Sequence, residues 1–455
     1  MIMHSPYYYF NANKFSQNIS SLKERLSEQV KVCFSVKSNP FMATYGAKYA
    51  DFVEVCSEGE YALCIKNIEP SKIVAGGVYK SEQWIKKLAQ NDVACISIES
   101  ITQLEQLERE AESANKKKDV LLRLSSNNQF GIAEEDIIQV SNCAERYPFM
   151  RFCGIHYYSG TQKKNPSKIG EDMRKIYAVL NNSCFNNPRI EYGPGIGAFL
   201  YGNPDDLWFR TIYDEMIREI NQLAEQYPVT LELGRALTAN IGKYVTTVVD
   251  VKNIADRKFY IVDGGIHHIS YYGMQAGFPN PEIRVAKNGN EEKVTICGSL
   301  CTASDILAKD ITVPKLEIGD RIAFLNVGAY SVTEARALFL SHKIPEVWIL
   351  DGNREFRVRE EIDTYMINSI NKCTMEQSIY DKVIECIKKV MEDKEQNILP
   401  ESRLQDDLLM ESIHILMLQV ALEETFYFQF DPMEDNFRQI FATVNSVCDY
   451  VSKHV

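Results

Sequence analysis

Short runs rich in β-branched and apolar residues alternate with longer amphipathic stretches through the first half of the chain. Eight runs have the length and composition of strands, and they lie at 31–37, 52–57, 72–77, 94–100, 120–126, 151–158, 189–195 and 229–235. Segments with apolar residues at helical spacing lie before and between them, such as 13–26 and 101–114. This alternation predicts an α/β fold with a closed parallel (β/α)8 barrel. An open, doubly wound sheet has the same alternation and remains the alternative.

The pattern changes after residue 238. Strand-like segments follow one another with turns and little helix between them, such as KYVTTVVDVK, KFYIVDGG, KVTICGS and DRIAFLNVG. They predict an antiparallel β domain over 239–365. From residue 374 the pattern is helical again. Amphipathic stretches at 375–394, 411–426 and 437–453 predict a small all-α bundle over 374–455.

Composition places the chain among globular proteins, with 45% hydrophobic and 25% charged residues. A length of 455 residues predicts two or three domains. No apolar run is long enough to span a bilayer, and the first residues, MIMHSPYYYF, do not have the pattern of a signal peptide. The twelve cysteines show neither a CxxC pair nor a disulfide or metal framework. We therefore expect a cytoplasmic protein with mostly reduced cysteines.

The net charge of −12 argues against a nucleic-acid partner. This charge is unevenly distributed along the chain. The stretch from Glu376 to Val455 has 16 acidic and 7 basic residues, so −9 of the total falls there. A shift of this size indicates that the helical C-terminal region is a separate module.

Four groups with chemical potential follow predicted strands, at the end of a parallel barrel where active sites lie. They are Lys37 after the first strand, HYYSGTQ (156–162) at the sixth, GPGIG (193–197) at the seventh and ELGR (232–235) at the eighth. Each also has an ordinary explanation. Lys37 can extend to solvent, the glycines can mark a turn, and Glu232 can pair with Arg235.

Together these groups match the needs of pyridoxal phosphate. A desolvated lysine such as Lys37 loses its proton readily and forms a Schiff base. The glycine-rich turn at 193–197 and Arg235 suit a phosphate. Glu232 can pair with a protonated ring nitrogen at the barrel mouth, and Tyr158 offers an aromatic face. The residues therefore predict a site for this aldehyde cofactor.

Six motifs occur in an order that resembles a known family. They are SVKSNP, GIHYYSGTQ, YGPGIG, LELGR, CGSLCTASD and NVGAY, and the resemblance covers roughly residues 5 to 350. The chain is similar to the fold-type III pyridoxal-phosphate decarboxylases, the diaminopimelate and ornithine decarboxylase group. The resemblance implies a barrel over 20–238, a β domain made of 1–19 and 239–365, and an obligate homodimer with shared active sites.

The resemblance also implies roles for individual residues. Lys37 matches the Schiff-base lysine, and Glu232 matches the carboxylate at the pyridine nitrogen. Cys301 matches a cysteine that the second subunit contributes as a proton donor, and Asp305 matches the aspartate that ends the same motif and lies near the substrate. The other matches, which surround the cofactor, are His156, Tyr158, Thr161, Gly193, Gly195, Ile196, Gly197, Gly234, Arg235 and Tyr330.

Three positions depart from the family pattern. Tyr158 replaces the histidine that stacks on the cofactor ring, and His156 becomes a neighbour without an assigned role. Thr161 replaces a serine near the cofactor. Thr302 replaces the acid that meets the distal amine of a diamino substrate. Because threonine cannot pair with that charge, the resemblance argues against a free diamine-type substrate.

The C-terminal stretch DDLLMESIHILMLQVALEETF resembles the attachment region of an acyl or peptidyl carrier protein. In that family a serine at the start of the second helix carries a 4'-phosphopantetheine arm, and Ser412 occupies this position. The resemblance implies a phosphopantetheinyl transferase and a loading enzyme as partners. The alternative is that Ser412 only caps the N-terminus of a helix.

The predicted function is decarboxylation of an amino acid or aminoacyl group in a specialised biosynthetic pathway. An acid at position 232 makes the cofactor ring a better electron sink, which favours decarboxylation over racemisation. The CTxxD motif at Cys301 resembles butirosin-type decarboxylases, which act on a glutamyl group tethered to a carrier. Two alternatives remain open: a decarboxylase of a free small amino acid whose product passes to the carrier, and a non-catalytic scaffold that binds the cofactor.

Overall fold

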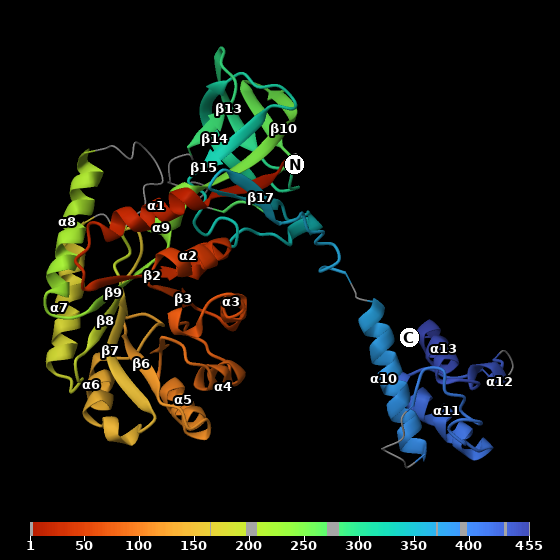
Figure 1. Cartoon of the computed structure of the whole chain (residues 1–455). Helices are drawn as coiled ribbons and strands as arrows, with labels where there is room; N and C mark the ends of the chain where they lie inside the picture. The colour runs from red at the N-terminus through yellow and green to blue at the C-terminus, as the bar shows by residue number, and fades with distance from the viewer. Residues whose placement is uncertain are drawn as a thin grey trace. The chain divides into compact units, whose positions relative to one another are not determined.

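The computed structural model describes residues 3–163, 165–196, 207–270, 282–369, 372–391, 398–431 and 435–454. It contains two compact units, Met1–Thr364 and Tyr365–Val455. Figure 1 shows a barrel and a β domain in the first unit and a group of helices in the second. Across the described ranges, no helix combines the length and apolar composition that crossing a membrane requires.

The barrel confirms the prediction from the alternating pattern. Eight parallel strands in the described part of the chain close into one sheet: β2 (Val30–Ser35), β3 (Phe52–Val55), β4 (Ile73–Ala75), β5 (Cys95–Ile98), β6 (Lys118–Leu124), β7 (Met150–Tyr158), β8 (Arg189–Gly193) and β9 (Val229–Leu233). Closure is made by β9 pairing with β2, where Val30 is opposite Val229. This pairing rules out the open, doubly wound alternative.

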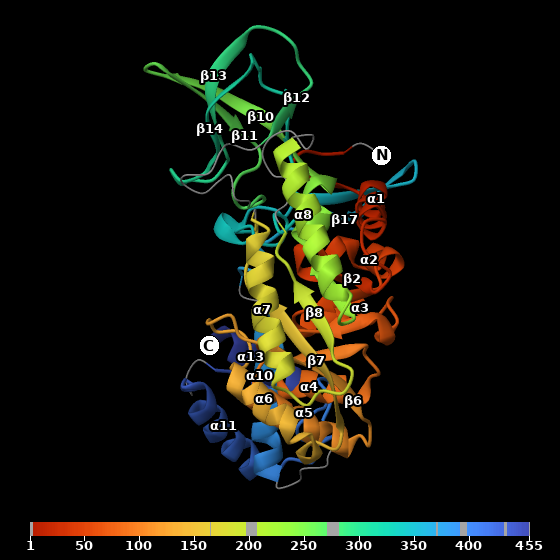
Figure 2. The ribbon, with the colours of Figure 1, turned by 90° about the vertical axis from the view of Figure 1, so that its left-hand side faces the viewer.

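Helices cover the outside of the barrel (Figure 2). They are α1 (Ala12–Lys23), α2 (Ala43–Tyr49), α3 (Glu58–Cys64), α4 (Glu82–Gln90), α5 (Ile101–Ser113), α6 (Glu134–Asn142), α7 (Ser167–Asn181) and α8 (Leu207–Ala224). The one-turn helix α9 (Arg235–Thr238) follows β9 at the mouth of the barrel. Serine caps begin several of them, because a hydroxyl satisfies an otherwise unpaired N–H of the first turn. Ser81 accepts from the Trp84 N–H, and Ser100 accepts from the Gln103 N–H.

The β domain combines the first strand of the chain with strands that follow the barrel. Its members are β1 (Tyr7–Asn11), β10 (Gly242–Ile254), β11 (Arg257–Val262), β12 (Ile283–Val285), β13 (Glu291–Cys297), β14 (Ile306–Pro314), β15 (Arg321–Leu325), β16 (Glu346–Asp351) and β17 (Arg354–Arg359). Most strand pairs described in this domain are antiparallel, as expected, and two parallel pairs make the sheet mixed. β1 lies antiparallel to β10 but parallel to β16, and β11 lies parallel to β13. Parallel pairs arise because these partners are not joined by hairpins.

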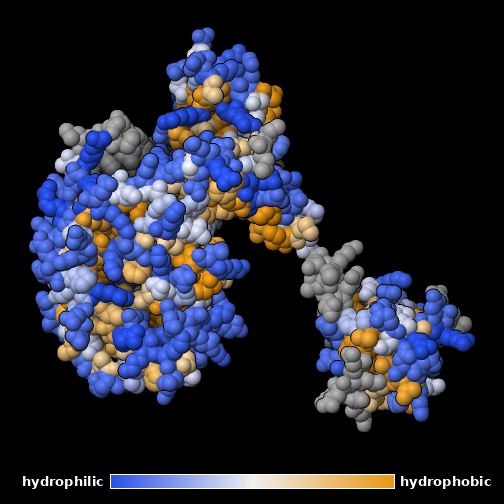
Figure 3. Space-filling model, in the orientation of Figure 1, coloured by the Kyte–Doolittle hydropathy of each residue, from blue (hydrophilic) through white to orange (hydrophobic). Residues whose placement is uncertain are grey.

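The C-terminal unit is helical, with α10 (Lys372–Met391), α11 (Ser412–Phe426), α12 (Phe437–Ile440) and α13 (Val444–His454). Val383, Leu418 and Val447 pack in its buried core. The amphipathic stretch at 437–453 contains two helices, α12 and α13. Thr443 and Ser446 exchange side-chain to backbone hydrogen bonds of 2.8 and 3.1 Å, which begin a new helix there. Figure 3 shows that apolar side chains also reach the surface of both units.

Candidate active site

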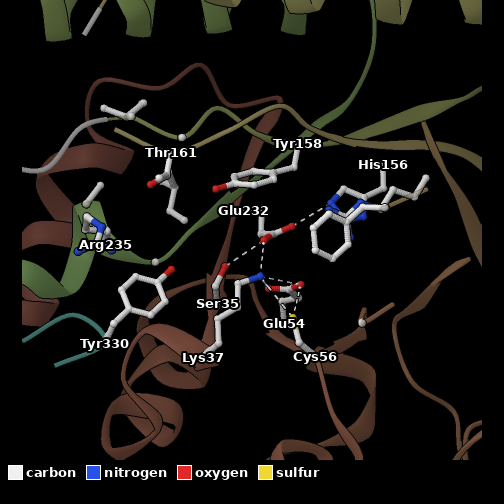
Figure 4. Close-up of a pocket in the computed structure, with 18 of the residues that line it drawn as sticks. Ser35, Lys37, Glu54, Cys56, His156, Tyr158, Thr161, Glu232, Arg235 and Tyr330 are labelled. Atoms are coloured by element: carbon white, nitrogen blue, oxygen red, sulfur yellow. Dashed lines mark hydrogen bonds and ion pairs between the residues drawn. The ribbon is translucent and has the colours of Figure 1, made fainter. Parts of the chain in front are cut away.

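The cavity at the mouth of the barrel has a volume of about 340 Å³. It brings together ten of the predicted residues: Lys37, His156, Tyr158, Thr161, Gly195, Ile196, Glu232, Gly234, Arg235 and Tyr330. In Figure 4, Thr161, Arg235 and Tyr330 lie at one end of the cavity and His156 lies at the other. The Lys37 amine and the Glu232 carboxylate lie between these ends.

Lys37 lies two residues after Ser35, the last residue of β2, in a short 3-10 turn over Val36–Ser38. Its Nζ atom is 3.0 Å from Glu54 Oε2, 3.2 Å from Glu232 Oε1 and 3.3 Å from Cys56 Sγ. Burial acts to lower the pKa of Lys37, but Cys56 and the Glu232 and Glu54 carboxylates together raise it well above its usual value. The amine is thus directed into the barrel by charge and does not simply extend to solvent.

Glu232 is held in its ionised form. Burial acts to raise the pKa of this carboxyl, but Lys37 and the hydrogen bond from His156 keep it well below its usual value. The Glu232 Oε2 atom lies 3.0 Å from His156 Nε2, and the Ser35 hydroxyl donates to Oε1 at 3.3 Å. Glu191, one strand away, behaves in the opposite way, because burial and the charges of Glu232 and Glu54 raise its pKa well above the usual value, against the opposing influence of Arg189. The site therefore keeps one negative carboxylate where a cationic ring nitrogen can meet it.

The other end of the cavity is shaped by glycine. Gly195 has φ +59°, and a Cβ atom there would lie 1.8 Å from the Gly160 carbonyl oxygen. A side chain at Gly234 would lie 2.9 Å from Ser38 Cβ and 3.3 Å from the Tyr330 hydroxyl. These close approaches leave backbone groups open to an anion, as in other phosphate-binding loops.

Arg235 completes the anion-binding end. It is the first residue of α9, and its guanidinium lies 4.5 Å from the centre of the Tyr330 ring. Burial raises the pKa of Tyr330 to about 12, against the opposing influence of Lys37 and Arg235, so the phenol is neutral and can donate a hydrogen bond. A guanidinium, a phenol and a glycine turn together suit a phosphate group.

The β domain reaches the barrel mouth through the loop that carries Tyr330. The Tyr330 N–H donates to the Ser38 carbonyl at 2.7 Å, and the Asn39 side chain donates to the Gly328 carbonyl at 2.8 Å. The residues directly after Lys37 are therefore fixed by the second domain. This explains why the turn SNP follows the lysine so closely.

Several predicted residues lie away from the cavity. Among the described residues, Cys301, Thr302 and Asp305 do not line it. Cys301 is exposed on the β domain, as is expected of a group that would act on another subunit. Asp305 is buried, and it accepts hydrogen bonds from the Ile266 and Leu300 N–H groups, both at 2.8 Å. Within this chain Asp305 thus supports its own loop.

The remaining predicted residues have separate positions. Gly193 lies beneath the Tyr158 ring, because a Cβ atom there would be 2.6 Å from Tyr158 Cδ2. Gly197 lies outside the described residues. Ser412 is the exposed first residue of α11 in the C-terminal unit. Glu411, and not Ser412, is the N-cap of this helix. The alternative in which Ser412 caps the helix is therefore wrong.

The sequence interpretation missed five polar residues at the cavity or directly behind it. They are Ser35, Glu54, Cys56, Ser97 and Arg123. The Cys56 thiol donates to Glu54 Oε1 at 2.9 Å, and Arg123 forms an ion pair with buried Glu99. Glu54 is the one charged residue of β3, whose sequence is FVEV, and this was the signal that could have revealed it.

Pyridoxal phosphate fits this arrangement. Lys37 would hold its aldehyde, Glu232 its ring nitrogen, Tyr158 one face of the ring, and Arg235 and Tyr330 its phosphate. The glycine cradle and the ionised buried carboxylate are the two structural observations that support the fit. When bound, this cofactor supplies an electron sink for a carbanion.

Comparison with known proteins supports the same conclusion. The family model described as "Pyridoxal-dependent decarboxylase, C-terminal sheet domain" matches residues 26–328. The chain is 30% identical over 390 residues to the L-glutamyl-(BtrI acyl-carrier protein) decarboxylase of Niallia circulans, with 78% of this chain and 90% of that protein covered. It is 25% identical over 390 residues to diaminopimelate decarboxylase of Helicobacter pylori, with 79% and 94% covered.

Solved structures confirm the fold. The crystal structure of Helicobacter pylori diaminopimelate decarboxylase complexed with L-lysine superposes with a TM-score of 0.70 at 22% identity, covering 80% of this chain and 96% of that one. The lysine/ornithine decarboxylase of Vibrio vulnificus gives a TM-score of 0.67 at 19% identity, covering 76% and 94%. The family model covers more than half of this chain. The chain therefore belongs to the pyridoxal-dependent decarboxylases of amino acids.

Proposed function

We propose that this enzyme decarboxylates an aminoacyl group that is tethered to its own C-terminal unit through a 4'-phosphopantetheine arm on Ser412. The observation that carries the proposal is the position of Ser412. It is exposed at the first turn of a helix in a separately folded, acidic helical unit. The similarity to an enzyme named for a carrier-bound glutamyl substrate supports it.

Tethering suits the chemistry of the site. An arm raises the effective concentration of the aminoacyl group and removes the need for tight binding of a free amino acid. Thr302 also favours this substrate class. It cannot pair with the second ammonium group of a free diamino acid, and its hydroxyl lies 3.0 Å from that of Ser304.

Three residues would have different roles in the reaction: Lys37, Glu232 and Cys301. The Lys37 amine would hold the aldehyde of the cofactor. Glu232 keeps a negative charge at the ring nitrogen, and Tyr158 orients the ring. In the homodimer that we propose, Cys301 of the partner subunit, or a water molecule, gives the proton that replaces CO2. Asp305 would hold the loop of that cysteine.

Intact-protein mass spectrometry tests the tether. After treatment with a phosphopantetheinyl transferase and coenzyme A, we expect the wild-type protein to gain one phosphopantetheine, and Ser412→Ala to gain none. Ser402→Ala is a matched control, because Ser402 also belongs to the C-terminal unit, but its hydroxyl only accepts a hydrogen bond from the Leu399 N–H within a turn. The control should gain the arm normally.

A loaded arm then tests the reaction. We expect an aminoacyl group on the arm to lose the mass of one CO2 in the wild type and to keep it in Lys37→Ala. Full decarboxylase activity of Ser412→Ala on a free amino acid would reject tethering and would favour the alternative in which the carrier accepts the product. A cofactor-loaded protein that decarboxylates neither form would instead favour the non-catalytic scaffold.

A further inference from the structure

One polar layer closes the floor of the cavity. Its four side chains come from alternate strands of the barrel: Glu54 from β3, Ser97 from β5, His156 from β7 and Glu232 from β9. Inward-facing residues of a (β/α)8 barrel form such layers of four, in which bulky aliphatic side chains usually dominate. These four are at most 8% exposed. Because they are polar and buried, each one needs a hydrogen-bond partner.

His156 connects two members of this layer. Its Nε2 atom is 3.0 Å from Glu232 Oε2, and its Nδ1 atom is 2.7 Å from the Ser97 hydroxyl oxygen. An ionised carboxylate only accepts hydrogen bonds, so the imidazole nitrogen that faces Glu232 has to carry hydrogen. In a neutral imidazole the other nitrogen is then an acceptor, and the hydroxyl of Ser97 is the donor that faces it.

We propose that Ser97 is a positioning residue of the cofactor site, which fixes His156 in the tautomer that carries hydrogen on Nε2, the ring atom that faces Glu232 at 3.0 Å. The hydroxyl of Ser97 donates to Nδ1 and thereby excludes the other tautomer, in which the Nε2 lone pair would face the carboxylate. His156 in turn fixes the orientation of Glu232 below the ring nitrogen. The inference concerns the cofactor end of the site and is the same for a tethered or a free substrate.

A buried lysine holds Ser97 in place. The Lys80 amine donates to the Ser97 carbonyl and to the Gly77 carbonyl, both at 2.8 Å, and to Gln103 Oε1 at 3.3 Å. Gly77 belongs to the cavity wall. Lys80 therefore joins the strand that carries Ser97 to the loop that borders the site. Lys80 thereby fixes the backbone of Ser97, whose hydroxyl makes the 2.7 Å contact with His156.

Nitrogen-15 NMR of histidine-labelled protein tests the proposal directly. The chain has seven histidines, and the signal that disappears in His156→Gln identifies the residue. We expect a pyrrole-type Nε2 and a pyridine-type Nδ1 in the wild type. Ser97→Ala should mix the two tautomers and raise the dissociation constant for pyridoxal phosphate roughly fivefold, as the loss of one hydrogen bond predicts. Ser97→Thr, which keeps the hydroxyl, should restore both properties.

Ser141→Ala is the matched control. Ser141 is 3% exposed, and its hydroxyl donates at 2.8 Å to the Ile138 carbonyl in α6, away from the cavity. Hydrogen on Nδ1 in the wild type, or on both nitrogens, would overturn the proposal. Weaker cofactor binding by Ser97→Ala without a change of tautomer would also overturn it, because Ser97 would then have only a structural role.

Discussion

The barrel mouth and the C-terminal unit present their reactive groups in opposite ways. The Lys37 amine has three polar partners within 3.3 Å, and two of them are buried carboxylates. Ser412 is exposed, and the next residue, Ile413, is 56% exposed. A group that holds a cofactor in one orientation needs surroundings that fix it. A group that carries an arm has to be reached by a transferase and then to move.

Two neighbouring layers of the barrel show a similar contrast. The layer at the cavity floor is polar, whereas Cys33, Val74 and Leu121 form a buried apolar cluster deeper in the barrel. Near this cluster Glu191 is kept neutral, because burial raises its pKa and the charges of Glu232 and Glu54 add to the effect. Of these two carboxyls, Glu232 in the layer that faces the cavity is ionised and Glu191 is neutral.

Loss of the Lys37 amine should have the largest effect. We expect Lys37→Ala to lower the rate of CO2 release by at least about a thousandfold, because the residue would supply the attachment of the cofactor aldehyde. Lys343→Ala, which removes an exposed lysine that pairs with Glu361, should keep the wild-type rate. Retained activity in Lys37→Ala would show that another amine holds the cofactor.

Neutralising Glu232 should have the second-largest effect on the rate of decarboxylation. Glu232→Gln keeps the size of the side chain but removes the charge, and we expect the rate to fall roughly a hundredfold. Single-turnover measurements with saturating pyridoxal phosphate separate this loss from weaker cofactor binding. An unchanged rate would mean that the ring nitrogen does not depend on Glu232.

Closing the glycine cradle should mainly weaken cofactor binding. In Gly195→Ala the new Cβ would meet the Gly160 carbonyl at 1.8 Å, and we expect at least a roughly tenfold higher dissociation constant for pyridoxal phosphate. Gly352→Ala is a matched control, since Gly352 has φ +58° but nothing within 4 Å of an added Cβ. Equal effects of the two variants would assign the loss to backbone strain alone.

The smallest effect concerns stability and the buried lysine behind the cavity. Burial lowers the pKa of Lys80 from 10.5 to about 8. Between these values the unfolded chain binds a proton that the folded chain lacks, so this residue makes folding more favourable as pH rises. Relative to Lys80→Met, the free energy of unfolding of the wild type should increase by about 2 to 3 kcal/mol across this window. Denaturant titrations of both proteins at pH 8 and pH 10.5 measure this difference, and a constant difference would contradict the shifted pKa.

The barrel was predictable because its strands are marked by a local pattern. All eight proposed runs contain a strand, and Lys37, Glu232 and Arg235 meet where the parallel topology places them. The strand pairing of the β domain was less predictable from the sequence. Its strand β1 pairs with β16, more than 300 residues away, and no local pattern specifies such a pairing.

Residues of the site also differed in whether a local sequence pattern reveals them. A charged residue in an apolar strand, such as Glu54, is visible in a sequence, whereas a serine such as Ser97 is common in buried strands and gives no signal. The position of Asp305 depended on the backbone amides of Ile266 and Leu300, which are 39 and 5 residues away along the chain. Only the folded loop shows that these amides receive the carboxylate.

The most direct test of this account is reduction of the cofactor-loaded protein with borohydride, followed by peptide mass spectrometry. If the Lys37 amine holds pyridoxal phosphate above the polar layer, the reduced pyridoxyl group will be found on the peptide that contains Val32–Pro40. A label on any other lysine, or on none, would contradict the account.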